Sequence, residues 1–136
     1  MQNKINKNDY ITLIARIMMA GLFVWAGYGK IIGYEGTQGY MEGMGVPGVL
    51  LPLVILLELG GGLSLIFGFL TKFSALSMAL FSIVAAFIFH DNFADETHKL
   101  MFIKDICLSG GLLMLFSYGA GKISIDDFIK HKILKK

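Results

Sequence analysis

Hydrophobic side chains dominate four long stretches of the chain, at residues 11–32, 49–70, 73–89 and 100–118, and polar segments separate them. At a rise of about 1.5 Å per residue, stretches of this length can cross a hydrocarbon core of about 30 Å, with 73–89 near the short limit. The chain has 136 residues, which leaves room for one domain. We therefore expect an all-α membrane protein, with four transmembrane helices in an antiparallel bundle that forms a single domain over residues 1–136.

The connections between these stretches differ in length and character. The first, residues 33–52, mixes apolar and small residues, and its tyrosines Tyr34 and Tyr40 suit a membrane interface. We expect a short interfacial or re-entrant helix at about 37–44, lying over one end of the bundle. The second connection is read as only Thr71 and Lys72, so the helices on either side of it must form an antiparallel hairpin.

The C-terminal segment predicts a fifth helix of a different kind. Ser124 can cap its start, with Asp127 three residues later in a capping-box arrangement. Apolar side chains then recur at helical spacing with lysines between them, at Ile125, Phe128, Ile129 and Ile133. This pattern is typical of a basic amphipathic helix on the membrane surface, and anchoring to lipid is favoured over docking of a partner protein.

Positive charge predicts how the bundle is oriented. If all four stretches span, one side carries Lys4, Lys7, Lys72, Lys122, Lys130, Lys132, Lys135 and Lys136. The connections on the opposite side carry Lys99 together with the acids Glu35, Glu42, Asp91, Asp95 and Glu96. Lysine-rich loops stay in the cytoplasm, so both termini are expected to be cytoplasmic and the first and third connections are expected to face outward.

Composition excludes several classes of protein. Hydrophobic residues make up 55% of the chain, and the net charge is only +2, so a soluble or nucleic-acid-binding protein is not expected. A single cysteine, Cys107, excludes an intramolecular disulfide and a cysteine-based metal cluster. The third connection contains two histidines and three acids, but their spacing matches no compact motif, and no metal site is predicted. No nucleotide fingerprint or nucleophile triad is visible, so we expect no intrinsic cofactor and assign no catalytic residue.

Ionisable residues within and beside the hydrophobic stretches are the main clue to function. Insertion of such a group into hydrocarbon costs roughly 2.5–3.5 kcal/mol, so these residues usually pair or serve a site. From the helical rise, Glu58 lies about 13 Å below the outer boundary, and Lys104 and Asp105 lie about 6–8 Å below it. Lys30 and His90 lie at the outer ends of their helices. The outer half of the bundle is therefore expected to collect charges from all four helices.

The partner of Glu58 remains open at this stage, because Lys104 and Lys30 are both within reach. Arg16 is a third choice, although it lies about 21 Å further from the outer side than Lys30. Arg16 and Lys30 are separated by about four helical turns and should share a face that points into the bundle. Trp25 and Phe23 could line a pocket for a ring, although a packing role is favoured.

Two roles for these charges are consistent with the sequence. They could form an ion-pair network that fixes helix packing. They could instead bind a polar head group or a small anion. The candidate ligand-binding residues are Arg16, Lys30, Glu58, His90, Lys104 and Asp105.

Short motifs in a fixed order over nearly the whole chain resemble the DoxX family. They are Ala15-Arg16-Ile17, residues 25–31 ending in Gly29-Lys30-Ile31, Gly45-Val46-Pro47, residues 57–63 starting with Leu57-Glu58, residues 68–72, residues 86–90 ending in His90, Lys104, residues 110–113 and Gly119-Ala120-Gly121. The family usually has an apolar or amide residue after the lysine of the fourth helix, whereas here Asp105 follows Lys104.

The resemblance implies a four-helix protein of the bacterial plasma (inner) membrane. Some relatives are subunits of quinone-linked oxidoreductases, including those that oxidise thiosulfate, and others are tied to quinone or oxidative stress. We therefore expect a subunit or accessory of a quinone- or sulfur-linked redox system, with membrane lipid, a redox partner protein, and a quinone or small anion as its partners. The alternatives are a non-catalytic scaffold or assembly protein and a small proton-coupled exporter that uses Glu58. A cation near Glu58 would depress its pKa and disfavour proton exchange near neutrality, so the exporter ranks last.

Overall fold

A computed structural model describes residues 4–89 and 94–134, and every regular element within these ranges is helical. The elements are α1 (Lys7–Ile32), α2 (Tyr34–Gly43), the short 3-10 helix η1 (Gly48–Leu50), α3 (Leu51–Ile55), the π-helix η2 (Leu56–Gly60), α4 (Gly61–Phe67), α5 (Thr71–Phe89), α6 (Glu96–Tyr118) and α7 (Ile125–Leu134). Among the described residues, four helical stretches are long and apolar enough to cross a membrane: Lys7–Ile32, Gly48–Phe67, Thr71–Phe89 and Glu96–Tyr118. The all-α, four-span class predicted from the sequence is confirmed.

Polar side chains fix where the first and last of these long helices begin. The Asn6 side chain accepts hydrogen bonds from the backbone N–H groups of Asn8 and Asp9, at 2.9 and 3.2 Å. In return, the Asp9 carboxylate accepts the Asn6 N–H at 2.8 Å, which completes a capping box at the start of α1. Asp95 caps α6 in a similar way, by accepting the Thr97 N–H at 2.9 Å. These caps satisfy N–H groups that have no partner within the helix.

The hairpin between the second and third spans turns at a different place from the one predicted. The prediction of Thr71 and Lys72 as the turn is wrong, because both are the first residues of α5 and the chain turns at residues 68–70. Gly68 adopts a left-handed conformation, with φ of 71°, and ends α4 before the hydrophobic run is finished. A Cβ atom at Gly68 would also collide with Arg16 and Ser124.

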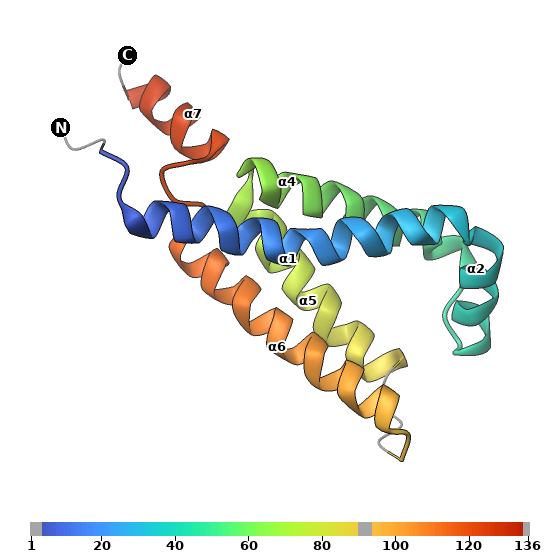
Figure 1. Ribbon diagram of the computed structural model, residues 1–136. Coiled ribbons are helices and arrows are strands. Elements are labelled where there is room, and N and C mark those ends of the chain that lie inside the picture. The colour runs from blue at the N-terminus through green and yellow to red at the C-terminus, as the bar shows by residue number, and fades with distance from the viewer. Residues whose placement is uncertain (1–3, 90–93, 135–136) are drawn as a thin grey trace.

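The four spanning helices are arranged as two arms that diverge from a common end, as Figure 1 shows. The first arm consists of α1 packed on α4 and η2, and the second arm consists of α5 packed along α6. Contacts between the arms are made chiefly by α4 with α5 and by α1 with α6. We call the joined end, which carries the start of α1, the α4–α5 turn and α7, the basal end. The opposite end, which carries α2, is the pocket end.

Small and apolar residues hold the arms together near the basal end. The buried core consists of Ala20, Phe23, Leu65, Ala75, Met78, Ala79, Leu112 and Leu115. Gly62 lets α1 and α4 approach closely, because a Cβ atom there would lie 2.7 Å from a methyl carbon of Val24. The Ser109 hydroxyl donates to the Ala79 carbonyl oxygen at 3.2 Å and joins α6 to α5. Such small-residue contacts are the usual means by which helices associate in membranes.

Candidate functional site

A cavity of about 460 Å³ occupies the space between the two arms at the pocket end. Its walls come from α1, α2, the α3–η2 segment, α5 and α6. Most of the lining is apolar, including Phe23, Met41, Val54, Phe81, Ala85 and Leu108. The polar side chains among the lining residues are Thr37, Lys30, Glu58, Ser82, Lys104 and Asp105, with the hydroxyl of Tyr40. A mostly apolar pocket of this size with a few polar groups is typical of a small-molecule site.

The first arm contributes an ion pair to this cavity. Lys30 Nζ lies 2.8 Å from Glu58 Oε1, and the Glu58 side chain is only 7% exposed. Gly27, one turn before Lys30, makes this proximity possible, because a Cβ atom there would lie 2.8 Å from Leu59 Cγ and 3.3 Å from Glu58 Cβ. The partner that the sequence left open is therefore Lys30.

Glu58 sits in the middle of a π-helix, which is rare in proteins. Its helix changes from α to π at Leu56 and returns to α at Gly61. A π-turn inserts an extra residue into the helical register and rotates the rest of the helix, and such turns are frequent at functional sites. The distortion is therefore a local structural reason to regard Glu58 as more than a packing residue.

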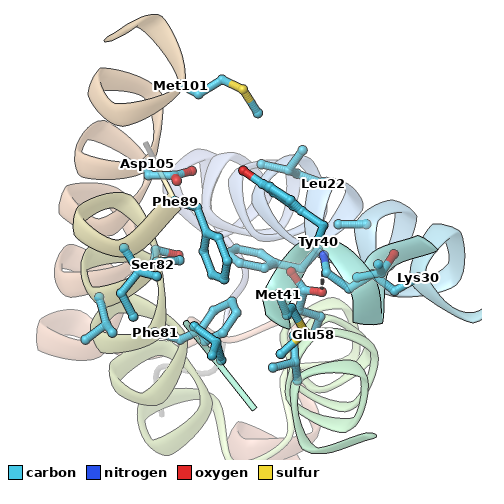
Figure 2. A pocket seen from close by; sticks show the side chains of 18 of the residues that line it. Leu22, Lys30, Tyr40, Met41, Glu58, Phe81, Ser82, Phe89, Met101 and Asp105 are labelled. Carbon is cyan, nitrogen blue, oxygen red and sulfur yellow. Dashed lines mark ion pairs between the residues drawn. The ribbon is translucent and has the colours of Figure 1, made fainter. Parts of the chain in front are cut away.

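The second arm contributes a matching pair on the opposite wall. Lys104 Nζ lies 3.8 Å from Asp105 Oδ1, and Lys104 is half exposed whereas Asp105 is largely buried. Figure 2 shows Asp105 and Ser82 on one side of the pocket, and the Lys30–Glu58 pair on the other. Each arm therefore presents one lysine and one carboxylate to the same space.

Helix α2 covers the pocket end and connects the two arms. The rings of Tyr40 on α2 and Phe89 on α5 lie 5.5 Å apart, and Met41 is buried beneath the helix. The helix runs from Tyr34 to Gly43, slightly earlier than the predicted 37–44. Sequence reasoning placed Tyr40 at a lipid interface and did not identify it, or Ser82, as lining a cavity, because a hydroxyl within an apolar helix gives no signal of what it faces.

Arg16 does not join this cavity, although it was a candidate for the same site. It is fully buried at the basal end, where Nη1 donates to the Leu65 carbonyl oxygen at 3.1 Å and Nη2 donates to the Ile123 carbonyl oxygen. Of the two aromatic residues suggested for a ring pocket, Phe23 lines the cavity, whereas Trp25 is 76% exposed and does not line it. His90 lies outside the described residues. The structure thus brings Lys30, Glu58, Lys104 and Asp105 together and leaves Arg16 apart.

Comparison with protein families identifies the chain. The model of the DoxX family matches residues 11–91, which include Arg16, Lys30 and Glu58. The chain belongs to the DoxX family. The matched range ends before α6, so Lys104 and Asp105 of this DoxX protein lie outside it.

The sequences of related proteins align with most of the length of this DoxX protein. It is 56% identical to the inner membrane protein YqjF of Escherichia coli over 124 residues, which cover 91% of this chain and 95% of the relative. It is 30% identical to the inner membrane protein YphA of the same organism, over 85% of this chain and 88% of that one. An uncharacterised protein of Haemophilus influenzae is 34% identical, over 87% of this chain and 82% of its own length. No solved structure matches. With four apolar helices, the protein is a multi-pass integral protein of the inner membrane.

Proposed function

We propose that this protein is the membrane subunit or accessory of a quinone- or sulfur-linked redox system, and that it binds a quinone head group in the cavity between the arms. The observation that carries the proposal is the cavity itself, which is apolar except for a few polar groups, chief among them a lysine and a carboxylate on each of two facing walls. Placing an ionisable group within the membrane costs free energy, and such groups commonly mark a functional site.

The residues present fit a quinone head group. A quinone supplies two-electron, two-proton redox chemistry when it is bound. Lysine ammonium groups are charge-assisted donors suited to carbonyl oxygens or to a small anion, and Lys30 and Lys104 supply one from each arm. Glu58 and Asp105 are carboxylates beside those lysines, where each can orient the ammonium or accept a proton. The apolar remainder of the lining, including Phe81 and Phe23, suits a ring and excludes water.

The proposed orientation puts both termini in the cytoplasm and the pocket end toward the outer leaflet. The lysines of the basal end, including Lys7, Lys72 and Lys130, support it through the positive-inside rule. The connections at the pocket end carry a single lysine, Lys99, which supports the same orientation. A redox partner protein would then reach the cavity from the outer side of the membrane.

The test is native mass spectrometry of the protein purified in mild detergent, together with extraction and identification of the small molecules bound to it. A quinone should copurify with the wild-type protein and be lost from Glu58→Gln and from Lys104→Met. Matched controls are Glu35→Gln and Lys99→Met, because neither residue lines the cavity. Retention of quinone by both cavity variants, or the presence of only bulk phospholipid in every sample, would refute quinone binding.

A scaffold or assembly role is the second candidate, and one observation favours it. The Lys30–Glu58 pair is closed at 2.8 Å and links α1 to η2, as expected of charges that fix the register of two helices. If this is their role, the cavity variants should lower stability without changing any bound molecule. The same mass spectra, combined with unfolding measurements, therefore separate the two candidates.

A further inference from the structure

Helix α7 is attached to the bundle at its first turn. The Asp126 carboxylate accepts the N–H groups of Leu70 and Thr71, at 2.7 and 2.8 Å, and the Asp126 N–H donates to the Gly68 carbonyl oxygen at 2.8 Å. The Ser124 hydroxyl accepts the Asp127 N–H at 3.1 Å, so Ser124 caps the helix as predicted, whereas the Asp127 carboxylate of the predicted capping box lies 3.2 Å from His131 Nδ1. Beyond this turn, α7 runs away from the spanning helices at the basal end, as Figure 1 shows.

Helix α7 carries an apolar face that the described chain covers only in part. Phe128 and Ile133 are 67% and 64% exposed, and Ile125 and Ile129 are also exposed. At about 100° per residue, these four side chains fall within an arc of about 140°. More apolar side chains are exposed on the adjoining part of α1, at Tyr10, Ile11 and Ile14, and Tyr118 is exposed where α6 ends. Aromatic residues gather in this way at membrane–water interfaces.

Charges at the basal end are separated by sign. The acidic side chains interact with groups of the protein itself. Asp9 caps α1 and accepts the Lys122 N–H at 3.3 Å, and Asp126 caps α5. Asp127 lies 3.2 Å from His131 Nδ1. Most of the lysines are instead exposed, namely Lys4, Lys7, Lys72 and Lys130, whereas the Lys122 ammonium donates to the Lys4 carbonyl oxygen at 2.8 Å. The outer surface of this end is therefore positive although its sequence contains acids.

We propose that α7 and the first turns of α1 form a binding surface for anionic phospholipid, with the apolar face of α7 in the acyl–headgroup boundary and the lysines on the headgroups. An anionic leaflet matches both features, because apolar burial supplies binding and each lysine near the surface adds to it. Lys132 lies within the apolar arc, and its stem can lie along that face while its ammonium reaches the headgroups. This inference is independent of what the cavity binds.

The experiment uses the full chain in nanodiscs of phosphatidylcholine alone or mixed with phosphatidylglycerol. An environment-sensitive fluorophore is attached at Phe128→Cys or His131→Cys, in a Cys107→Ser background because Cys107 is exposed. With phosphatidylglycerol, the label at position 128 should shift to the blue and be quenched by a lipid-borne quencher. The label at 131, which is on the other face, should stay in water. Backbone hydrogen exchange in α7 should slow at least tenfold on adding the anionic lipid.

Charge variants test the electrostatic part separately. The double variant Lys130→Gln/Lys132→Gln should lose the dependence on phosphatidylglycerol, whereas Lys99→Gln, a lysine at the pocket end, should keep it. Equal exchange in both lipids, or equal water exposure of the labels at 128 and 131, would overturn the proposal. Protection of α7 that depended on the number of protein copies per nanodisc, and not on the lipid, would also overturn it and assign the face to a second copy of the chain.

Discussion

The basal end and the pocket end both contain ionisable side chains among apolar helices, but they use them differently. At the basal end, Arg16 and Asp126 bind backbone carbonyl and N–H groups contributed by α4, the α4–α5 turn, α5 and the segment before α7. At the pocket end, Lys30, Glu58, Lys104 and Asp105 face one another or a cavity. Depth and charge alone therefore do not identify a site. The two ends are distinguished by whether the polar atoms are directed at backbone or at open space.

Replacement of Arg16 should have the largest effect on stability. Arg16→Met keeps a long apolar stem but removes the donors to the Leu65 and Ile123 carbonyl oxygens. Hydrogen bonds from charged groups contribute about 1.5–3 kcal/mol each, so the loss of both should lower the free energy of unfolding by about 3–6 kcal/mol. Unfolding in mixed detergent micelles by titration with sodium dodecyl sulfate measures it. If Lys30→Met proves equally destabilising, the contrast between the two ends fails.

The cap supplied by Asp126 should have a smaller and more local effect. Asp126→Asn keeps the shape of the side chain but leaves one acceptor oxygen for the two N–H groups of Leu70 and Thr71. Loss of a cap costs about 1 kcal/mol. Hydrogen exchange should accelerate in the first turn of α5 and in α7 but not in α2. Asp127→Asn is the matched control, since Asp127 pairs with His131 and does not cap α5. Equal acceleration in both variants would contradict the assigned role.

Lys30 and Glu58 at the pocket end should be energetically coupled, but their ion pair should contribute only modestly to the free energy of unfolding. A double-mutant cycle of Lys30→Met and Glu58→Gln should give a coupling energy of about 1 kcal/mol, in the range of polar contacts between membrane helices. The double variant should recover stability relative to the single variants but should not recover a bound quinone. Recovery of both stability and the bound molecule would mean that neither side chain contacts the ligand.

Trp25 should have the smallest effect in this series. It is 76% exposed on α1 and does not line the cavity, so Trp25→Ala should change the free energy of unfolding by no more than about 0.5 kcal/mol. Binding of a quinone should be unchanged. A loss of several kcal/mol would indicate that Trp25 is covered by another protein chain in the membrane, and it would be accompanied by a change in oligomer mass.

The number of spanning helices and the short helix before the second span could be predicted from the sequence, because bilayer thickness imposes a length on apolar stretches. The capped start of α7 could also be predicted, because Ser124 and Asp127 act within one helical turn. The turn at residues 68–70 was misplaced, because Phe69 and Leu70 are apolar and extend the hydrophobic run past the helix. Gly68 carried the correct signal, since glycine favours the left-handed conformation that ends helices.

The candidate site could be predicted only in part. Helical rise correctly grouped Lys30, Glu58, Lys104 and Asp105 at one end, because depth depends on the number of residues alone. The helical rise could not show whether Lys30 or Lys104 pairs with Glu58. That choice depends on the rotation of the helices about their axes, which the π-turn at Leu56–Gly60 alters. The helical rise also could not predict the hydrogen bond from Arg16 to the Ile123 carbonyl oxygen, because tertiary packing brings together these residues, which are far apart in the chain.

The divergence of the two arms also has a consequence for the membrane that surrounds the protein. A molecule whose helices are joined in one leaflet and spread in the other has a larger cross-section in the second leaflet, and so it is a wedge. Insertion of α7 beside the joined end would add area to the narrower leaflet and reduce this taper. The curvature that the protein prefers in its bilayer would therefore depend on whether its last helix is seated in lipid.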